Sequence, residues 1–487
     1  MKFFFHASTL LSLLHLALVL GISIRVIMRR PNTGVALAWL FIVAAIPYVG
    51  AFFYFLLGER RINKGRVRRI TARRADYKKL VQRGIDRGLT DVPWERHPPE
   101  AKEMDQLGRT MVGFPTVTGS TGKLYSVTDE ILDQLAQDID QAERSVLMEF
   151  YIWNAGGKAD TVLEALISAA QRGVSCRVLI DALGARPWWK GDQPARLRAA
   201  GVKLIEALPV GILRSLVDRT DLRIHRKIVV IDGKFAWTGS MNMVDPKFFK
   251  QDANVGEWVD AMVRTEGSVV GPLALTMIGD WMLESGESIE EVIVDSKIEE
   301  VTPKGSGDAQ VVPSGPGETE DGLLQMLLAT INAAKRELVL TTPYFVPDES
   351  LLRALRGASA RGVQVHMIVP EKVDSLLTRY ASRSYYDELM EFGIQIHLYR
   401  VGLLHTKSIT ADSRITMFGT VNLDMRSLWI NYEVALFVYG SEFGTAIREL
   451  QQSYMDDSDL LEPAEWAKRS ELQRFLESTF RLTSPIL

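Results

Sequence analysis

Two copies of a histidine–lysine–aspartate pattern are the residues best suited to chemistry. Each copy has the spacing His-x-Lys-x4-Asp and is followed by Gly-(Ser/Thr)-x-Asn. One such pattern occurs by chance in roughly a few per cent of chains this long, but two copies in register indicate a duplicated unit. Corresponding residues are 180 positions apart, in the pairs His225 and His405, Lys227 and Lys407, Asp232 and Asp412, Gly239 and Gly419, and Asn242 and Asn422.

The residue types in the pattern fit displacement at a phosphodiester. A neutral imidazole is a nucleophile and a proton carrier near neutral pH. A lysine is a cation suited to a phosphoryl oxygen. Alternate residues of a strand share one face, so each histidine should project together with its lysine. Two such pairs supply one nucleophile, one general acid and two cations, which suffices for a two-step displacement with no metal and no cofactor.

The remaining polar residues of the two motifs complete the predicted site. The hydroxyl and amide groups that follow each motif are expected to bind the substrate, and these are Ser240, Asn242, Thr420 and Asn422. The two aspartates, Asp232 and Asp412, are placed in the catalytic set with the histidines and lysines. Each is followed by a turn residue, Gly233 or Ser413, so a role in forming the turn is an equal alternative to direct chemistry.

The segments around each motif predict an α/β fold. Each half alternates apolar runs of strand length with a helical pattern, which favours sheets covered by helices. In the first half the expected strands are 145–153, 175–182 and 202–208; in the second they are 337–345, 363–369 and 394–399. A stretch rich in Pro, Gly and Ser is the natural junction. The predicted boundaries are therefore 116–298 for the first half, 299–320 for the junction and 321–487 for the second half.

The N-terminal segment predicts a helical hairpin in a membrane. Residues 3–24 and 31–58 carry no formal charge, and about 20 residues suffice for a helix to cross a bilayer. A second apolar run and the lack of a cleavage pattern argue against a removed signal peptide. Residues 1–58 are thus predicted to form two transmembrane helices, followed by a basic linker over 59–115. The basic residues directly after Gly58 place this end, with the catalytic halves, on the cytoplasmic side.

Composition excludes several other classes. The 487 residues carry a net charge of −3, so nothing indicates a nucleic-acid partner. A single cysteine, Cys176, rules out an internal disulfide or a thiolate cluster. The sequence has neither a GxxxxGK[ST] loop nor a GxGxxG loop, so no nucleotide is expected.

The doubled motif resembles the phospholipase D superfamily, which is defined by it. The resemblance implies two pseudo-symmetric α/β/α halves, with one histidine attacking phosphorus and the other protonating the leaving alcohol. The first-half histidine, His225, is the implied nucleophile. An acidic residue downstream of each motif is implied to orient the imidazole, and the candidates are Glu257 in the first half and Glu433 in the second.

Within the superfamily the whole chain is similar to the bacterial cardiolipin synthases. The similarity rests on the anchor, on Glu149-Phe-Tyr-Ile-Trp, on Phe249-Lys-Gln-Asp, and on the runs 342–347 and 419–427. It implies an enzyme of the inner membrane whose partners are phosphatidylglycerol and other membrane lipids, and which joins two phosphatidylglycerol molecules into cardiolipin and glycerol. A phospholipase D that hydrolyses lipids to phosphatidic acid, a superfamily nuclease and a membrane-tethered scaffold are the alternatives, and the oligomeric state is left open.

Overall fold

The computed structural model describes residues 2–29, 33–46, 48–55, 69, 77–211, 221–296, 301–319 and 321–482. The chain divides into two compact units. The first comprises Met1–Lys64 with Val210–Thr220, and the second comprises Gly65–Pro209 with Asp221–Leu487. Both motifs lie in the second unit.

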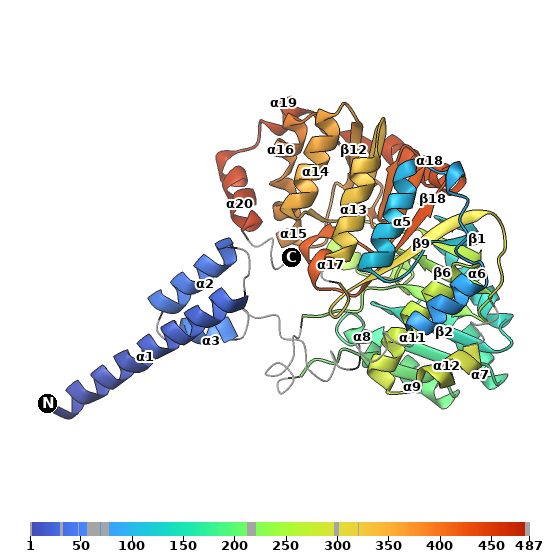
Figure 1. Ribbon diagram of the computed structural model, residues 1–487, viewed down its shortest axis with the longest axis horizontal. Helices are drawn as coiled ribbons and strands as arrows, with labels where there is room; N and C mark the ends of the chain where they lie inside the picture. The colour runs from blue at the N-terminus through green and yellow to red at the C-terminus, as the bar shows by residue number, and fades with distance from the viewer. Residues whose placement is uncertain are drawn as a thin grey trace. The chain divides into compact units, whose positions relative to one another are not determined.

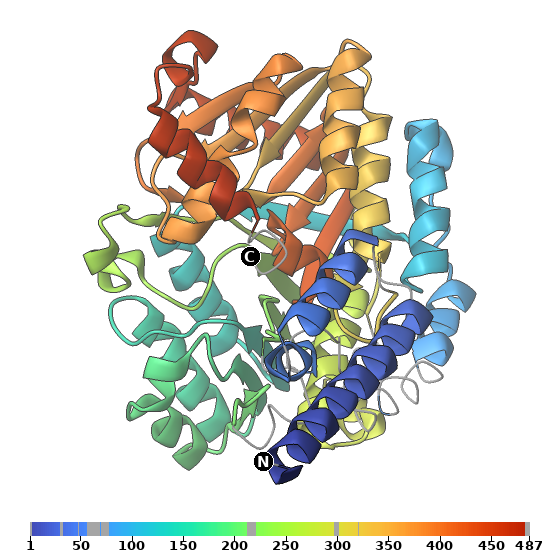
Figure 2. The same cartoon turned by 90° about the vertical axis from the view of Figure 1, so that its left-hand side faces the viewer.

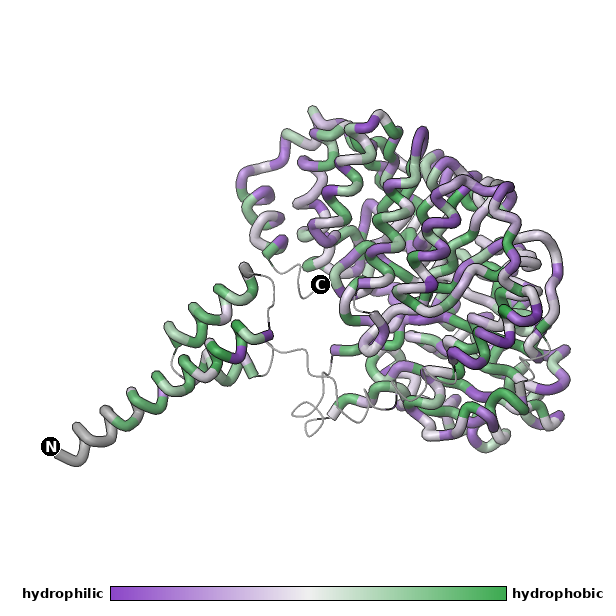
Figure 3. Tube along the Cα trace, viewed as in Figure 1, coloured by the Kyte–Doolittle hydropathy of each residue, from purple (hydrophilic) through white to green (hydrophobic). Residues whose placement is uncertain are grey.

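The first unit is built from apolar helices (Figure 3). These are α1 (Lys2–Arg29), α2 (Thr33–Ala45) and α3 (Val49–Phe53). Their contacts are made by a small group of buried residues, namely Ile22, Val26, Val43, Ala51 and Tyr54. The outer faces of α1 and α2 are apolar and exposed, for example at Leu16 and Phe41, as expected for helices surrounded by lipid.

One helix of this unit is long and apolar enough to cross a bilayer, within Ser12–Arg29. At a rise of about 1.5 Å per residue α1 is about 42 Å long, whereas the 13 residues of α2 reach about 20 Å. The hydrocarbon core is about 30 Å thick, so the second predicted span stays a prediction. Of the eight basic residues directly after Gly58, only Arg69 is among the described residues; the eight are Arg60, Arg61, Lys64, Arg66, Arg68, Arg69, Arg73 and Arg74.

The second unit is organised on one sheet of fifteen strands in the described part of the chain (Figure 1). Two sets of seven strands meet at its centre, where β1 and β9 pair antiparallel. From this centre outward the first half has β1 (Val117–Tyr125), β8 (Met262–Gly267), β6 (Phe235–Gly239), β5 (Ile228–Ile231), β2 (Ser145–Phe150), β3 (Ser175–Asp181) and β4 (Lys203–Ala207). The second half repeats this order with β9 (Gly307–Ser314), β18 (Glu433–Tyr439), β16 (Ile415–Gly419), β15 (Ser408–Ala411), β10 (Glu337–Thr341), β12 (Gln364–Pro370) and β13 (Gln395–Tyr399), and β19 (Ser458–Leu460) adds an edge. The duplication in the sequence is thus a duplication of the sheet.

Helices cover both faces of each half, as the α/β prediction requires. In the first half one face carries α6 (Thr128–Asp140), α7 (Ala159–Gln171) and α9 (Gln193–Ala199), and the other carries α11 (Val270–Ser285) and α12 (Ile289–Ser296). The second half is covered by α5 (Pro99–Met111), α13 (Gly322–Ala333), α14 (Glu349–Ala360), α16 (Tyr386–Glu391) and α18 (Ser441–Asp456). Figure 2 shows the face that also carries α15 (Leu376–Arg383) and α20 (Glu471–Arg481), which pack together.

Local sequence signals explain the elements that lead to the motifs. In α7 the apolar residues Val162, Leu163 and Leu166 share one face and are fully buried. Asp348 caps α14, because its side-chain oxygen accepts a hydrogen bond from the backbone N–H of Ser350 at 2.7 Å. These helices hold β2 and β10 in the sheet next to the motif strands β5 and β15.

Two predicted boundaries differ from the structure. The junction expected at 299–320 contains β9, which pairs with both β1 and β18 near the centre of the sheet. The linker expected at 59–115 contains α5, which packs against α13. Both segments have more Pro, Gly or charge than a typical core element. Their burial depends on partners distant in sequence, which local composition does not report.

Candidate active site

The two motifs come together where strands of both halves end. His225 and His405 lie just before β5 and β15, and each is held by backbone contacts to the other half. The backbone N–H of His225 donates to the carbonyl of Tyr432 at 2.9 Å, and that of His405 donates to the carbonyl of Val259 at 2.8 Å. The charge of Lys407 acts on His225 and that of Lys227 acts on His405. The two pairs therefore form one site.

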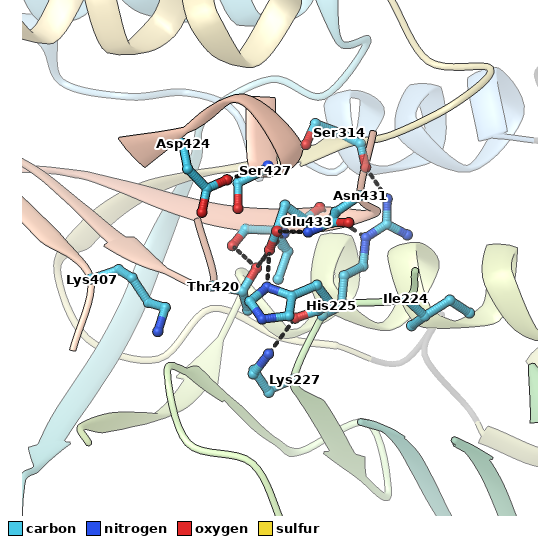
Figure 4. A network of polar contacts seen from close by, with 12 residues as sticks. Ile224, His225, Lys227, Ser314, Lys407, Thr420, Asp424, Ser427, Asn431 and Glu433 are labelled. Atoms are coloured by element: carbon cyan, nitrogen blue, oxygen red, sulfur yellow. Dashed lines mark hydrogen bonds and ion pairs between the residues drawn. The ribbon is translucent and has the colours of Figure 1, made fainter. Parts of the chain in front are cut away.

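Each imidazole is bonded to a carboxylate from the opposite half. Nδ1 of His225 lies 2.8 Å from Oε2 of Glu433, and Nδ1 of His405 lies 2.7 Å from Oδ1 of Asp260 (Figure 4 shows the His225 side). All four side chains are buried. Because an ionised carboxylate only accepts hydrogen bonds, each Nδ1 carries the proton. The lone pair of each neutral ring is then on Nε2, which is the atom available for chemistry.

A hydroxyl group holds each carboxylate in place. Ser240 donates to Oδ1 of Asp260 at 2.5 Å, and Thr420 donates to Oε2 of Glu433 at 2.6 Å. Both hydroxyls also accept a backbone N–H, from Ala261 and Val434 respectively. Ser240 and Thr420 were expected to bind substrate, but these bonds use the hydroxyl proton of each and leave them as positioning residues.

The lysines are buried cations beside the imidazoles. Nζ of Lys227 donates to the carbonyl of His225 at 2.6 Å, and Nζ of Lys407 donates to the carbonyl of His405 at 2.5 Å. Burial lowers the pKa of Lys227 to about 8 and that of Lys407 to about 7, although the carboxylates of the site work in the opposite direction. An ammonium group with one hydrogen bond of three in use can donate further bonds to a phosphoryl oxygen.

Burial also decides the state of the histidines. It lowers the pKa of both His225 and His405 to about 4, against the pull of the neighbouring carboxylates. Burial opposes ionisation of Asp260 and Glu433 as well, but the partner histidine, the nearby lysine and the hydroxyl donor outweigh it, so the pKa of each carboxyl lies below its usual value. At neutral pH the free site thus holds neutral imidazoles and ionised carboxylates.

The predicted orientation of the histidines needs two corrections. Glu257 is exposed, and the carboxylate bonded to His405 is Asp260, three residues further on. Glu433 does hold an imidazole, but that of His225 rather than that of its own half. The crossing follows from the contact between halves, because β7 (Trp258–Val259) pairs with β14 (Leu403–Leu404), directly before His405.

The motif aspartates lie at the far ends of their strands. Asp232 follows β5, and its carboxylate accepts the backbone N–H groups of residues 143–145 at 2.8–2.9 Å. Asp412 follows β15 and accepts those of residues 335–337 at 2.9 Å. Seven residues of extended chain span about 23 Å. The contacts therefore contradict a direct catalytic role and make both aspartates connectors between neighbouring strands.

The two motif asparagines stay candidates for binding the substrate. Oδ1 of Asn242 accepts the backbone N–H of Ile152 at 3.2 Å. One buried side-chain atom in each asparagine, Nδ2 of Asn242 and Oδ1 of Asn422, makes no hydrogen bond to the described part of the chain. A buried polar atom without a partner is costly unless a ligand or water completes it.

Sequence reasoning missed Asp260, although the sheet register identifies it. The motif glycines Gly239 and Gly419 pair with Met262 and Ala435, and each carboxylate lies two residues before that partner. Asp260 is 35 residues after His225, whereas Glu433 is 28 residues after His405, so the first half has seven more residues in this connection. Counting residues alone therefore selected the wrong acid.

Aromatic rings and an arginine were also missed. The ring centroid of Tyr151 lies 5.1 Å from that of His225, and the ring centroid of Trp258 lies 4.4 Å from that of His405. Arg226 donates to the carbonyl of Glu433 at 2.9 Å and pairs with Asp280, so it fixes the backbone that carries the His225 carboxylate. Only the position of Arg226 between the motif histidine and lysine could have signalled this role.

The structure thus combines a doubled sheet with one site to which both halves contribute a histidine, a lysine and a carboxylate. The family model "Cardiolipin synthase, PLD-like domain" matches residues 135–261 and 327–455, and a phospholipase D-nuclease N-terminal model matches residues 17–59. The chain belongs to the cardiolipin synthase family.

Relatives and one solved structure agree with this assignment. Cardiolipin synthase A of Erwinia tasmaniensis is 41% identical over 476 residues, and that of Yersinia pseudotuberculosis is 40% identical; each alignment covers 96% of both chains. The crystal structure of phosphatidylserine synthase from Haemophilus influenzae has a TM-score of 0.60 at 15% identity, over 79% of this chain and 100% of that one. This likeness supports the fold.

Proposed function

We propose that the protein is a phosphatidyltransferase that converts two phosphatidylglycerol molecules into cardiolipin and glycerol. The observation that carries the proposal is the pair of buried imidazoles, each with a carboxylate on Nδ1 and a lysine beside it. Such a pair provides a nucleophile on one side of phosphorus and a proton carrier on the other. The names of the relatives supply the substrate class.

In the first step Nε2 of His225 attacks the phosphorus of the donor lipid. A P–N bond forms and the P–O bond to the glycerol headgroup breaks. His405 gives its Nε2 proton to the leaving oxygen, so glycerol departs as a neutral alcohol. Glu433 stabilises the positive charge that develops on the His225 ring during attack.

In the second step the headgroup hydroxyl of another phosphatidylglycerol attacks the phosphohistidine. His405, now neutral, takes the hydroxyl proton, the new P–O bond forms, and the P–N bond breaks to restore His225. Water in place of the lipid alcohol would give phosphatidic acid. Exchange of one phosphodiester for another is close to isoenergetic, so the reaction needs no nucleotide.

The charges of the site explain how His405 can hold a proton despite its low pKa in the free protein. When both lysines are protonated, their charges and those of the Asp260 and Glu433 carboxylates cancel one another. A bound phosphodiester adds one negative charge to this buried site. A proton on one imidazole restores neutrality and is stabilised by the adjacent phosphate. Substrate binding should therefore bring in the proton that the leaving group takes.

We also propose that the enzyme is a multi-pass protein of the bacterial inner membrane with its catalytic unit in the cytoplasm. The apolar helices α1 and α2 and the basic residues after Gly58 support this arrangement. Labelling of an engineered cysteine near residue 100 in intact cells and in lysed cells tests the side. Because Cys176 is buried, it should contribute little background. Labelling from outside intact cells would contradict the proposal.

Lipid analysis after incubation with phosphatidylglycerol alone tests the reaction itself. The purified full-length protein, treated with a chelator, should produce cardiolipin and free glycerol in equal amounts. Phosphatidic acid as the main product would make the protein a hydrolase. Loss of activity on chelation, with recovery on adding a divalent metal, would contradict the cofactor-free mechanism.

A further inference from the structure

The two halves differ in the length of the chain segment between the motif histidine and the carboxylate that the same half supplies to the site. In the first half it is seven residues longer, and it contains the short helices η3 (Pro246–Phe248) and η4 (Gln251–Ala253). Lys250 lies between them. The shorter connection of the second half contains α17 (Met425–Trp429) instead. The extra residues therefore place a side chain near the site that the second half does not match.

Lys250 crosses to the second half and joins a buried polar group. Its Nζ lies 2.9 Å from Oδ2 of Asp374, whose side chain is only 8% exposed. The other oxygen of Asp374 accepts a hydrogen bond from the hydroxyl of Tyr344 at 2.8 Å. These three residues, which we call the Lys250–Asp374–Tyr344 cluster, join the two halves through side chains alone.

The cluster lies directly beyond His405. Trp258 packs on the His405 ring, and Nζ of Lys250 lies 5.4 Å from the centroid of the Trp258 ring. When His405 is protonated during turnover, its charge acts to lower the pKa of Asp374. Tyr344 in turn is influenced by Tyr151, the ring beside His225. The cluster thus flanks the site on the side of the histidine that handles the alcohol.

We propose that the Lys250–Asp374–Tyr344 cluster is a binding site for the vicinal hydroxyl groups of a glycerol headgroup. Asp374 provides acceptor oxygens, the oxygen of Tyr344 can still accept a hydrogen bond although its proton is donated to Asp374, and the ammonium of Lys250 has donors left for a hydroxyl oxygen. None of these groups is needed to hold phosphate, a task that the motif lysines already serve. The inference rests on the proposed function and adds the residues that select the alcohol.

One such subsite serves both steps of the reaction. The leaving alcohol of the first step is glycerol, and the attacking alcohol of the second is the glycerol headgroup of a lipid. Both exchange a proton with the same Nε2 of His405, so both must occupy the same place. A site that hydrogen-bonds the spare hydroxyls also favours a glycerol headgroup over water, which has no second hydroxyl to anchor.

Competition between two alcohols tests the subsite without depending on the overall rate. The full-length enzyme is given cardiolipin with equal concentrations of deuterated glycerol and 1-propanol, and the ratio of deuterated phosphatidylglycerol to phosphatidylpropanol is measured. The label is needed because unlabelled phosphatidylglycerol is the leaving group whenever cardiolipin is the donor. The unaltered enzyme should favour glycerol by about tenfold or more, as for a hydroxyl bonded to a charged group. Asp374→Asn and Tyr344→Phe should each move the ratio towards one, and each should raise the share of phosphatidic acid.

Glu337→Gln provides the matched control. Glu337 forms a similar partly buried pair with Arg448, but at the opposite end of β10 from Tyr344. Its substitution should leave the alcohol ratio unchanged. An unaltered ratio in both Asp374→Asn and Tyr344→Phe would overturn the subsite, as would equal use of glycerol and 1-propanol by the unaltered enzyme. The proposed function fails separately, if the unaltered enzyme transfers phosphatidyl groups to neither alcohol.

Discussion

Nδ1 of His225, in the first half, donates a hydrogen bond to Oε2 of Glu433, in the second half, at 2.8 Å. The reverse arrangement joins His405 to Asp260. Neither half therefore contains a complete histidine–carboxylate pair of its own. The site exists only where the two halves meet, and the pairing of β1 with β9 joins these halves in one sheet.

The crossed pairs should give the two carboxylates different kinetic effects. Asp260→Asn should slow turnover of phosphatidylglycerol by about 100-fold or more, because it disturbs the proton carrier. A lipid with a nitrophenol leaving group, which needs no proton, should restore the first step. Glu433→Gln disturbs the nucleophile instead, so it should slow the first step with both substrates. Burst kinetics with the two lipids measures this difference.

Glu257→Gln is the control for that comparison, because Glu257 is exposed and three residues from Asp260. It should change turnover by less than about twofold. A loss comparable to that of Asp260→Asn would contradict the assignment of Asp260. Equal rescue of Asp260→Asn and Glu433→Gln by the activated lipid would contradict the crossing of roles.

The motif aspartates should matter for stability rather than for the chemical step. Asp232→Asn removes the negative charge that three backbone N–H groups bond and leaves at least one of them without an acceptor, so the free energy of unfolding should fall by about 1–3 kcal/mol. Thermal unfolding of the detergent-solubilised protein, together with activity per folded molecule, measures both effects. A hundredfold loss of activity in a variant with unchanged melting temperature would show that Asp232 does take part in chemistry.

Asp412 should also make stability depend on pH. Its three backbone N–H donors overcome the effect of burial and hold its pKa below the usual value. The stabilisation is therefore present above the ordinary aspartate pKa and is lost as the pH falls through the lower, folded value. Comparing the melting temperatures of the unaltered protein and Asp412→Asn between pH 3 and pH 7 tests this. Their difference should shrink as the pH falls, and a constant difference would contradict the prediction.

The pH profile of kcat/KM should be bell-shaped. Below about pH 4 His225 is protonated and loses its lone pair. Above about pH 4 the site has to take up the proton that His405 gives to the leaving group, so kcat/KM should fall gradually, and above pH 7 to 8 it should fall more steeply as Lys407 and then Lys227 lose their charges. A bound phosphodiester stabilises both ammonium groups, so the alkaline limb of kcat should lie at higher pH than that of kcat/KM.

Lys407→Arg separates the two lysines in this profile. An arginine keeps its proton over this pH range. The decrease in kcat/KM near pH 7 should therefore disappear, even if the variant is slower than the unaltered enzyme. A short-chain phosphatidylglycerol assayed from pH 3.5 to 9.5 provides the data. An alkaline limb that is unchanged in Lys407→Arg would contradict its assignment to Lys407.

The motifs and the two-part α/β fold could be predicted because their signals are local. The constant offset of 180 residues shows the duplication, and the burial patterns of β2 and β10 follow from runs of apolar residues. The carboxylates could not be assigned in this way. Their partners are fixed by the register of β6 with β8 and of β16 with β18, and by contact between halves, neither of which the spacing reports.

The hydroxyls of Ser240 and Thr420 illustrate a second limit. Residue type and position correctly placed them beside the site, but not what they bond. Each hydroxyl can donate one hydrogen bond, and it already donates this bond to a buried carboxylate within 2.6 Å in the absence of substrate. The Lys250–Asp374–Tyr344 cluster was not foreseen either. Lys250 is more than 90 residues from both other members in the sequence, and the three residues share no motif.

Mass spectrometry of the covalent intermediate tests the central claim most directly. The full-length enzyme is mixed with phosphatidylglycerol, quenched within milliseconds under alkaline conditions that preserve phosphohistidine, and digested. The account predicts a phosphatidyl adduct on the peptide that contains His225, absent in His225→Ala and retained in trace by His405→Ala with an activated lipid. An adduct on His405 in the unaltered enzyme would reverse the roles, and an active enzyme with an adduct on neither histidine would contradict the mechanism.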